Sequence, residues 1–583
     1  MKLPTINEIK TQTSTTAEFK GLNKTEMCAE NEFNIAYNVT ADKYPASTTR
    51  SLRRKVSSAD KVLGLIGGDK LYIVYKGKIR IVDGNSAHDV PLSVNLSDEK
   101  KKLVRMGSRL VIFPDKKIFD TETETMSNIE ISYYNENAVF TLTNAYGDAI
   151  TYHDDAYYAE HDPKSGDYLL VNEDGNDVLK QYNETEDVWV DITTSYVMVT
   201  AVGIGTTFKA GVGVKFEVDC SNWEEGKTLF PNKEGNLNTA TYVIKSVSEN
   251  AITFAGILKH TKTINGAFRV KRECPNIAYA TEHYNRIWGC NKEGTEIYAC
   301  ALGDATSWNT FEGISTDSYV ATIGSEGAFT GAITYLGYPT FFKKDSLIKV
   351  SVSANGAHVL KEVFCRGVAE GCSESLCTVN EVLHYKSTDA IMYYDGSLPT
   401  KLSDKLGDLT NFKNVVAGSH KGKLYMCGST GCYVYDSTYG MWTETDDSFD
   451  MFAQYGEYFV YAKDKLVTLS DAIPNIVSMS ETNSDIHWEL RTRDIDYYTP
   501  NSKYIQRIVM KLRLNSGSSV KVSIKYDDGV YENVLRYQQR GTSIIPIALT
   551  MRRCNRFSLK VEGIGEGTIY SITKTLAEGS DKY

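Results

Sequence analysis

The sequence lacks the motifs by which most enzymes are recognised. It contains no Gly-x-Ser-x-Gly nucleophile motif, no His-Glu-x-x-His or His-x-His metal motif, and no complete phosphate-binding loop. The nine histidines stand singly. A nucleophile also needs a base and an orienting group, and no such set is visible. We therefore expect no catalytic residue, no cofactor, no metal, and a protein that is not an enzyme.

The 11 cysteines include no Cys-x-x-Cys pair. Cys365, Cys372 and Cys377 gather ahead of His384, but these spacings fit no common zinc ligand pair. Cys427 and Cys432 are placed opposite each other across one predicted hairpin. We expect reduced thiols in a protein made in the cytosol.

Long apolar runs are also missing. No stretch of 18 apolar residues occurs, and residues 1–17 lack the apolar core of a signal peptide. We therefore expect no segment that spans a membrane.

Basic residues are outnumbered, 64 against 74 acidic ones, which gives a net charge of −10. A chain of this sign has no overall electrostatic footprint for holding phosphates. An acidic wall instead repels DNA, which suits a channel through which DNA slides. Proline is scarce, at 12 residues, whereas tyrosine is frequent, at 38. Tyrosine fits half-buried strand surfaces, so its abundance favours β-structure.

A strand, a tight turn and a second strand recur along the chain. The seven hairpins lie at residues 70–83, 109–120, 286–300, 339–350, 382–395, 423–436 and 457–469. Repetition at blade spacing is typical of a β-propeller. The hairpins leave the blade number open at six or seven. We therefore predict an all-β protein whose propeller comprises residues 57–123 and 271–472, with mechanical scaffolding as its function.

The third hairpin begins 177 positions after the start of the second, and we expect the long interval to hold an inserted β-domain at residues 124–270. Strands are predicted at 208–218, 241–247 and 251–254, in a small barrel or a sandwich. Its acidic turns, at 153–155 and 172–177, suggest calcium ligands. They lack the distal glutamate of an EF-hand, so we interpret them as tight turns.

Different patterns flank the propeller. Residues 473–583 predict a C-terminal β-sandwich, with strands at 487–494, 505–514, 519–526, 543–548 and 556–562 and a closing strand in 563–572. Residues 1–56 are polar and read as an N-terminal arm. Its basic run from Arg50 to Lys55 is either a solvated charged stretch or part of an arm that docks on a neighbouring subunit.

Some carboxylate and aromatic residues allow either a functional or a structural interpretation. Glycosidases use paired carboxylates on a propeller channel, and Asp304, Asp345, Asp395 and Asp436 lie near hairpin turns or ends. We favour turn capping for them. The tract from Trp288 to Trp308 is either a packed blade edge or a surface on which sugars stack, and we favour packing.

Several segments, taken in order, resemble one known family. They are Phe19–Asn23 (FKGLN), Tyr44-Pro45 with Arg50, Arg286–Gly289 (RIWG), Ile297-Tyr298 with Leu302–Trp308 (LGDATSW), Phe341–Ser346 (FFKKDS), and Arg552–Cys554 with Phe557–Gly563. Together they resemble the tail-nozzle or DNA-stabilisation proteins of short-tailed bacteriophages. The resemblance covers most of the propeller and the sandwich, and covers the insert poorly.

The resemblance implies a virion structural protein that assembles in the bacterial host cytoplasm. Such proteins form a ring, usually a hexamer, below the portal and adaptor proteins, and the ring extends the DNA channel and helps to retain packaged DNA. Tail fibres or a tail spike are further implied partners. Two alternatives stay open: a carbohydrate-binding or carbohydrate-hydrolysing propeller, and a receptor-binding tail-tip protein with the insert as its adhesin.

Overall fold

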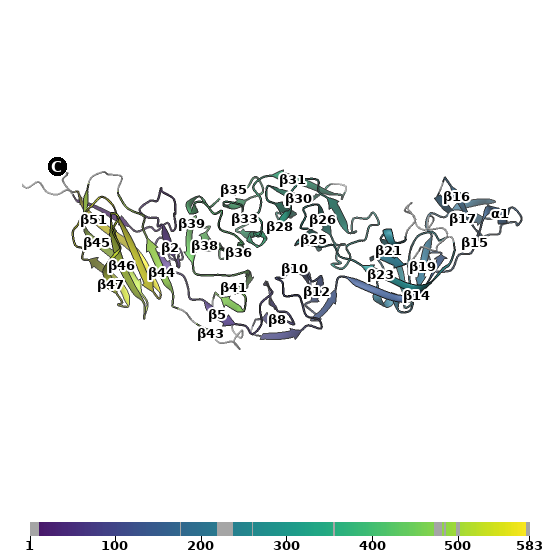
Figure 1. The fold of residues 1–583 in the computed structure, drawn as a ribbon, viewed down its shortest axis with the longest axis horizontal. Coiled ribbons are helices and arrows are strands. Elements are labelled where there is room, and N and C mark those ends of the chain that lie inside the picture. The colour runs from purple at the N-terminus through teal and green to yellow at the C-terminus, as the bar shows by residue number, and fades with distance from the viewer. Residues whose placement is uncertain are drawn as a thin grey trace, which may run out of the picture.

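The computed structural model describes residues 11–84, 86–174, 176–218, 237–258, 260–353, 356–470, 481–482, 485–496 and 502–578. The described chain is elongated, with a β-sandwich at one end, a β-propeller in the middle and a β-barrel with a small outer subdomain at the other end (Figure 1). No helix within these ranges is long and apolar enough to cross a membrane. The predicted fold class is confirmed.

Seven sheets of the described chain form the propeller blades. Blade 1 is β6 (Gly64–Ile66), β7 (Leu71–Val74), β8 (Lys78–Asp83) and β9 (Ser86–Pro91). Blade 2 is β10 (Lys102–Met106), β11 (Arg109–Phe113), β12 (Lys117–Asp120) and β13 (Thr125–Asn128). Blade 3 is β24 (Tyr279–His283), β25 (Arg286–Cys290), β26 (Glu296–Ala299) and β27 (Tyr319–Thr322).

The remaining four blades follow in chain order. Blade 4 is β28 (Phe329–Tyr335), β29 (Tyr338–Lys343), β30 (Ser346–Val352) and β31 (His358–Phe364). Blade 5 is β32 (Cys377–Val379), β33 (Val382–Lys386), β34 (Ile391–Tyr394) and β35 (Thr400–Lys401). Blade 6 is β36 (Val416–His420), β37 (Lys423–Gly428), β38 (Gly431–Asp436) and β39 (Met441–Thr445). Blade 7 is β40 (Met451–Tyr455), β41 (Tyr458–Lys463), β42 (Leu466–Leu469) and β5 (Arg54–Ser57), with β43 (Glu481–Thr482) beside β5.

Each predicted hairpin forms the second and third strands of one blade. Leu71 pairs with Val82 in blade 1, and Leu424 pairs with Tyr435 in blade 6. The first strands follow one another around a closed ring: β6 lies against β10, β10 against β24, β24 against β28, β32 against β36, β36 against β40, and β40 against β6. Two 3-10 turns, η2 (Ser373–Ser375) and η3 (Asp404–Leu406), flank blade 5, and η2 contacts β28. The repeated hairpins in the sequence therefore predicted the propeller correctly.

The ring is closed by a strand from the N-terminal side of the propeller. β5 pairs antiparallel with β42, and Val56 of β5 lies opposite Val467 and is buried in the apolar cluster shared by blades 1 and 7. Sharing the last blade between two distant segments joins the ends of the wheel by backbone hydrogen bonds.

A closed six-stranded barrel is inserted between blades 2 and 3. Its strand order is β14 (Ile131–Thr143), β19 (Tyr196–Thr200), β22 (Ala251–Ala255), β21 (Tyr242–Ser248), β20 (Gly213–Val218) and β23 (Lys262–Arg272). Two short helical turns, α2 (Ile204–Thr207) and η1 (Leu237–Thr239), accompany it. The barrel alternative of the prediction is correct, although residues 208–212 precede β20 rather than belong to it.

The barrel carries a second insertion, which the sequence did not separate from it. We name residues 144–195 the tip subdomain. It contains β15 (Tyr152–His153), α1 (Asp155–Tyr158), β16 (Tyr168–Glu173), β17 (Asn176–Asn183) and β18 (Val188–Asp191), the strands forming one sheet at the far end of the molecule (Figure 1).

The C-terminal sandwich has two sheets, and both contain strands from the N-terminal segment. The first, named the outer sheet, holds β3 (Val39–Thr40), β4 (Ser47–Thr49), β51 (Gly567–Glu578), β45 (Lys503–Leu514), β48 (Gly541–Ile547), β1 (Thr11–Thr16) and β49 (Arg553–Cys554). The second holds β2 (Ile35–Tyr37), β44 (His487–Arg491), β50 (Phe557–Ile564), β46 (Ser519–Tyr526) and β47 (Glu532–Tyr537).

Residues 11–57 are therefore not a free arm. β1 pairs with β51, β2 pairs with β39 and β44, and β5 pairs with β42 of the same chain. The expectation of a solvated arm, or of one that docks on a neighbouring subunit, is wrong for these residues. The sequence does not reveal these strands because their pairing partners lie hundreds of residues away in the chain. The predicted sandwich boundary at 472–473 lies outside the described residues.

Candidate functional site: the junction between propeller and sandwich

The carboxylates considered for a catalytic pair lie on four different blades. Asp304, Asp395 and Asp436 each cap a turn: their side chains accept from the backbone N–H groups of Thr306, Ser397 and Thr438 at 2.9, 3.0 and 3.0 Å. Asp345 lies in the turn between β29 and β30. Each of the three capping carboxylates thus serves the turn in which it sits, as the turn preference of aspartate predicts.

The acidic turns of the insert have the same role. Asp154 is the N-cap of α1 and accepts from the backbone N–H of Tyr157, and Asn172 bonds Asp177 across the turn between β16 and β17 at 3.0 Å. Among the described residues, no group of three or more His, Cys, Asp or Glu side chains is placed to hold a metal ion.

The remaining candidates are parts of the blades. Trp288 and Trp308 are buried, and the indole N–H of Trp308 donates to the Ala305 carbonyl at 2.9 Å. Burial lowers the pKa of His384 to about 4, and its Nδ1 lies 2.9 Å from the Val382 carbonyl. Cys427 and Cys432 form a disulfide across β37 and β38, which corrects the expectation of reduced thiols for this pair.

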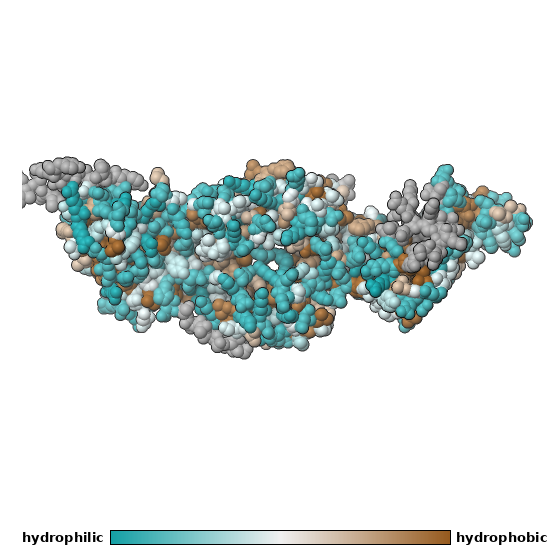
Figure 2. Space-filling model, in the orientation of Figure 1, coloured by the Kyte–Doolittle hydropathy of each residue, from teal (hydrophilic) through white to brown (hydrophobic). Residues whose placement is uncertain are grey.

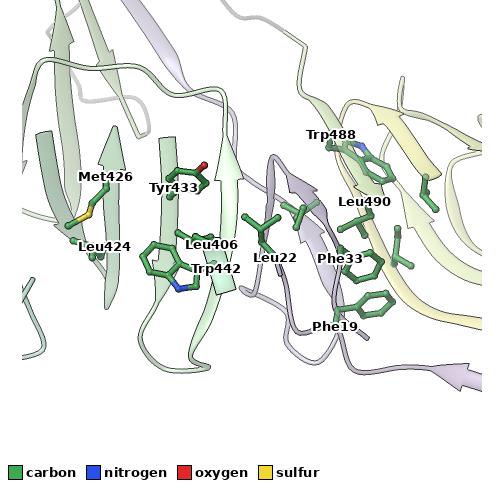
Figure 3. Packing of buried hydrophobic residues seen from close by; sticks show 14 of the residues in the cluster. Phe19, Leu22, Phe33, Leu406, Leu424, Met426, Tyr433, Trp442, Trp488 and Leu490 are labelled. Atoms are coloured by element: carbon green, nitrogen blue, oxygen red, sulfur yellow. The ribbon is translucent and has the colours of Figure 1, made fainter. Parts of the chain in front are cut away.

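The FKGLN segment lies where the propeller meets the sandwich. Phe19, Leu22 and Phe33 are almost fully buried in one apolar cluster that contains residues of blade 6 and of both sandwich sheets. Figure 3 shows Leu22 on the side of Trp442 and Leu406, and Phe33 on the side of Leu490. Burying each of these side chains contributes about 1.5–3 kcal/mol. The apolar side chains of this segment therefore pack between the propeller and the sandwich and form part of a core that the two domains share.

Backbone contacts hold this segment against blade 6. The Leu22 N–H donates to the Trp442 carbonyl at 2.7 Å, and the Phe33 N–H donates to the Gly21 carbonyl at 2.8 Å. Gly21 has a left-handed backbone, with φ of 73°, and a Cβ there would lie 2.4 Å from the Trp442 oxygen. Only glycine fits this approach, because any side chain would push the segment off the strand.

β2 continues the sheet of blade 6 into the sandwich. It pairs in parallel with β39 and antiparallel with β44, so that one nine-stranded sheet runs from β36 to β47. Next to it, the buried Asn38 donates from Nδ2 to the His487 carbonyl at 2.7 Å and accepts at Oδ1 from the Asp446 N–H at 3.1 Å. One amide thus connects the two domains.

Arg50, which belongs to the resemblance, completes this connection. Its Nε donates to Asn38 Oδ1 at 3.0 Å, and its Nη2 donates to Asp446 Oδ1 at 2.6 Å. The nearby ring of Tyr44 stacks on Tyr439 of blade 6, with centroids 4.3 Å apart. The basic run, which the sequence left open as a solvated stretch or as part of a docking arm, thus helps to hold the propeller and the sandwich of this chain together.

Arg53 forms a buried ion pair with Asp447 at 3.4 Å, with exposed side-chain fractions of 6% and 2%. Burial alone would raise the pKa of Asp447, but Arg53, Arg50 and the Tyr461 hydroxyl hold it below its usual value. The Tyr461 hydroxyl donates to Asp447 Oδ1 at 2.6 Å, and the Arg53 guanidinium lies 4.7 Å from the Phe459 ring centroid. The tandem Asp446-Asp447 is opposite in charge to the run from Arg50, but nothing local in the sequence connects the two segments.

Other residues that carry the resemblance also act in packing. The guanidinium of buried Arg286 donates to three backbone carbonyls, those of Ser315 at 2.5 Å, Asp317 at 2.6 Å and Cys300 at 3.2 Å. Phe341 and Phe342 are fully buried in blade 4. The structural role of these residues, which is to hold a blade or a domain junction in place, therefore explains their presence.

The similarities of this chain to known proteins are remote. No family model matches the sequence, and no curated protein matches it. Apo AztD from Citrobacter koseri is similar at 11% identity and a TM-score of 0.28, over 68% of this chain and 95% of that chain. An exo-β-1,3-galactanase from Phanerochaete chrysosporium has 6% identity and a TM-score of 0.17, over 74% and 98% of the two chains. A glycoside hydrolase family 43 arabinoxylan arabinofuranohydrolase from Bacillus subtilis has 9% identity and a TM-score of 0.18, over 70% and 95%.

The galactanase and the arabinofuranohydrolase are enzymes. The expectation that this chain is not an enzyme rested on missing motifs alone, and with enzymes among the similar propeller proteins we withdraw it. By its own sheet topology, the chain is a β-propeller protein with an inserted β-barrel and a C-terminal β-sandwich.

Proposed function

We propose that this chain is a structural subunit of a bacteriophage tail, of the nozzle or DNA-stabilisation kind. In this role several copies form a ring below the portal and adaptor proteins, and the ring continues the channel through which DNA leaves the particle. The family resemblance points to a hexamer and to tail fibres or a tail spike as neighbours.

The observation that carries the proposal is the structural role of the residues on which the family resemblance rests. Phe19, Leu22, Arg50 and Arg286 are consumed in fixing blades and domains to one another. Sequence signatures of this kind preserve a shape, and a rigid multi-domain body is what a subunit needs if its interfaces are to stay aligned around a closed ring.

Electron microscopy of the purified full-length protein and of intact particles tests the proposal. We expect rings with a central pore, each interface burying more than about 1,000 Å², and the same ring in the tail. Isolated subunits at high protein concentration, together with particles that lack the ring, would contradict it.

A second candidate is carbohydrate contact by the tip subdomain, and one observation favours it. The rings of His153, Tyr157 and His161 form a continuous stack, with centroids 3.7 and 4.2 Å apart, and Tyr158 and Tyr182 both contact Trp189. Tyr157 is 38% exposed. His161 is exposed as well, and an exposed aromatic stack beside polar groups suits contact with the sugar rings of a receptor.

A glycan array with three proteins tests this candidate. We expect the wild type to bind a defined set of glycans, Tyr157→Ala to lose this binding, and Tyr146→Ala to keep it. Tyr146 is the matched control because it is 92% exposed in the same subdomain and belongs to no ring pair above. Equal glycan binding by the two variants would contradict the assignment.

A further inference from the structure

The net charge of the chain comes from one end of the molecule. The tip subdomain contains thirteen acidic and two basic residues, a net charge of −11, whereas the rest of the chain has 62 basic and 61 acidic residues. The tip and the sandwich lie at opposite ends in Figure 1. Screening acts over about 8 Å at physiological salt, so the acidic tip does not set the potential at the sandwich.

The sandwich end has the opposite sign. Residues 485–578 contain fifteen basic and ten acidic residues. On β45 of the outer sheet, Arg507, Lys511 and Arg513 are exposed and alternate with the buried Ile508, Met510 and Leu512. Because side chains alternate along a strand, the three cations project from the same face of the outer sheet.

No carboxylate neutralises these cations from within their sheet. β1, β45 and β48 contain no Asp or Glu, and β51 contains only Glu578, at its end and opposite Lys503. Within the described chain none of the three cations forms an ion pair. By contrast, buried Lys574 on the other side of the sheet pairs with Glu30 at 2.9 Å. The charge of this face is thus available to a partner.

Hydroxyl groups surround the three cations. Arg507 lies opposite Thr575, and Arg513 lies opposite the exposed Thr542. Thr13 and Thr15 of β1 bond to Thr575 and Thr573 at 3.2 and 3.0 Å. Arginine, lysine and threonine side chains are the groups that contact phosphate and sugar in protein–DNA complexes.

The face has few of the apolar anchors of a protein interface. On β51, the ring centroid of the half-buried Tyr570 lies 5.8 Å from the Lys511 ammonium group. On the exposed positions of β45 and β48, Ile544 is the one large hydrophobic side chain that is strongly exposed, at 68%. Protein interfaces have a core enriched in aromatic residues and depleted of charge. Figure 2 shows a largely hydrophilic surface at the sandwich end in the view drawn. The chemistry therefore favours a polyanion over an acidic protein.

We propose that the outer face of the β1-β51-β45-β48 sheet binds the phosphate backbone of double-stranded DNA without sequence preference. The row from Arg507 to Arg513 extends over about 20 Å, since a strand rises about 3.4 Å per residue. This length matches roughly six base pairs. The inference rests on the proposed function, which brings duplex DNA to the protein, and it replaces the expectation of purely repulsive contact drawn from the net charge.

Fluorescence anisotropy with labelled 30-base-pair duplexes of two unrelated sequences tests the inference on the full-length protein. We expect equal affinity for both duplexes and a slope of log Kobs against log salt of about −3, from three phosphate contacts. Changing Arg507, Lys511 and Arg513 together to Gln should remove most of that slope and the binding at 50 mM salt.

The matched control changes Lys361, Lys401 and Lys421 of the propeller to Gln, since these lysines are also exposed and the net charge falls equally. It should bind like the wild type. Thermal unfolding of both triple variants checks that each folds.

Equal binding by the two triple variants overturns the inference, as does absence of wild-type binding at 50 mM salt. Loss of rings rather than of DNA binding in the Arg507, Lys511, Arg513 variant also overturns it, because the face would then be a protein interface. Rings that bind no DNA refute this inference alone, whereas DNA binding without rings in particles refutes the proposed function alone.

Discussion

At the scale of single residues, the junction depends on a few polar groups whose partners the sequence conceals. Arg50 and Arg53 read as solvated charges because nothing in their neighbourhood shows an acidic partner. Their partners, Asp446 and Asp447, are nearly 400 positions away. Asn38 is equally inconspicuous, yet it bonds both domains. Such roles arise from tertiary contacts and have no local signature.

Replacing Asp447 by Asn should destabilise the propeller strongly. The change leaves the Arg53 guanidinium buried without its counter-ion, which costs about 3–5 kcal/mol. Asp83→Asn is the control, because Asp83 and Lys70 form an exposed pair with side-chain exposures of 50% and 42%, worth about 0–1 kcal/mol. Urea unfolding followed by tryptophan fluorescence measures both. Similar losses in the two variants would show that the buried pair is not special.

The same pair predicts a pH dependence. The pKa of Asp447 is lower in the folded protein than its usual value, so its ionised form stabilises the fold above the unfolded pKa of about 3.9. This contribution is lost as pH falls through the folded pKa. The stability difference between wild type and Asp447→Asn should therefore be full at pH 7 and shrink below about pH 4. A difference that is constant over this range would contradict the assignment.

At the scale of elements, local pairs were predictable and distant pairs were not. The hairpin that pairs Leu71 with Val82 is predictable, because its two apolar strands and tight turn are contiguous in sequence. β6 is short and begins with Gly64, and β13 reads Thr-Met-Ser-Asn, so neither shows a strand pattern. β2 and β5 were missed because their partners are far away in sequence.

Gly21→Ala should weaken the contact between the FKGLN segment and β39. The left-handed backbone costs a residue with a side chain about 1–2 kcal/mol. The added Cβ would also meet the Trp442 oxygen and break the hydrogen bond from Leu22, which costs about 1 kcal/mol or more. Gly107→Ala isolates the first effect, since Gly107 has φ of 58° and open space around it. Denaturant unfolding should show a clearly larger loss for Gly21→Ala, and equal losses would refute the steric argument.

At the scale of the whole molecule, the insert is a separate module whose two ends meet. Ile131 and Arg272 are paired across β14 and β23, and the Arg272 guanidinium donates to the Asn128 and Ile129 carbonyls. The sequence placed an all-β insert in the gap between hairpins because the spacing broke there. The sequence did not predict the tip subdomain as a separate unit. Its strands lie within the insertion, and its acidic turns resemble ordinary tight turns, so that no change of pattern marks where it begins or ends.

Replacing residues 132–271 by a short Gly/Ser linker should leave the propeller intact. Blades 2 and 3 contact each other directly through β10 and β24, so the melting temperature of the remaining protein should change by less than about 4 °C. Circular dichroism melting measures this. Deletion of blade 4, residues 329–364, is the contrasting variant and should abolish cooperative unfolding because it opens the wheel. Collapse of the insert-deleted protein would show that the barrel supports the blades.

The closing strand β5 has a consequence for how this chain is made. Arg53 leaves the ribosome 394 residues before Asp447, a delay of roughly 20–80 s at about 5–20 residues per second. During that time the nascent polypeptide carries strands β1 to β5 with open edges, and unpaired edges of this kind invite aggregation. Translation speed and chaperone supply in the producing cell should therefore govern the yield of native protein more than the stability of any single blade.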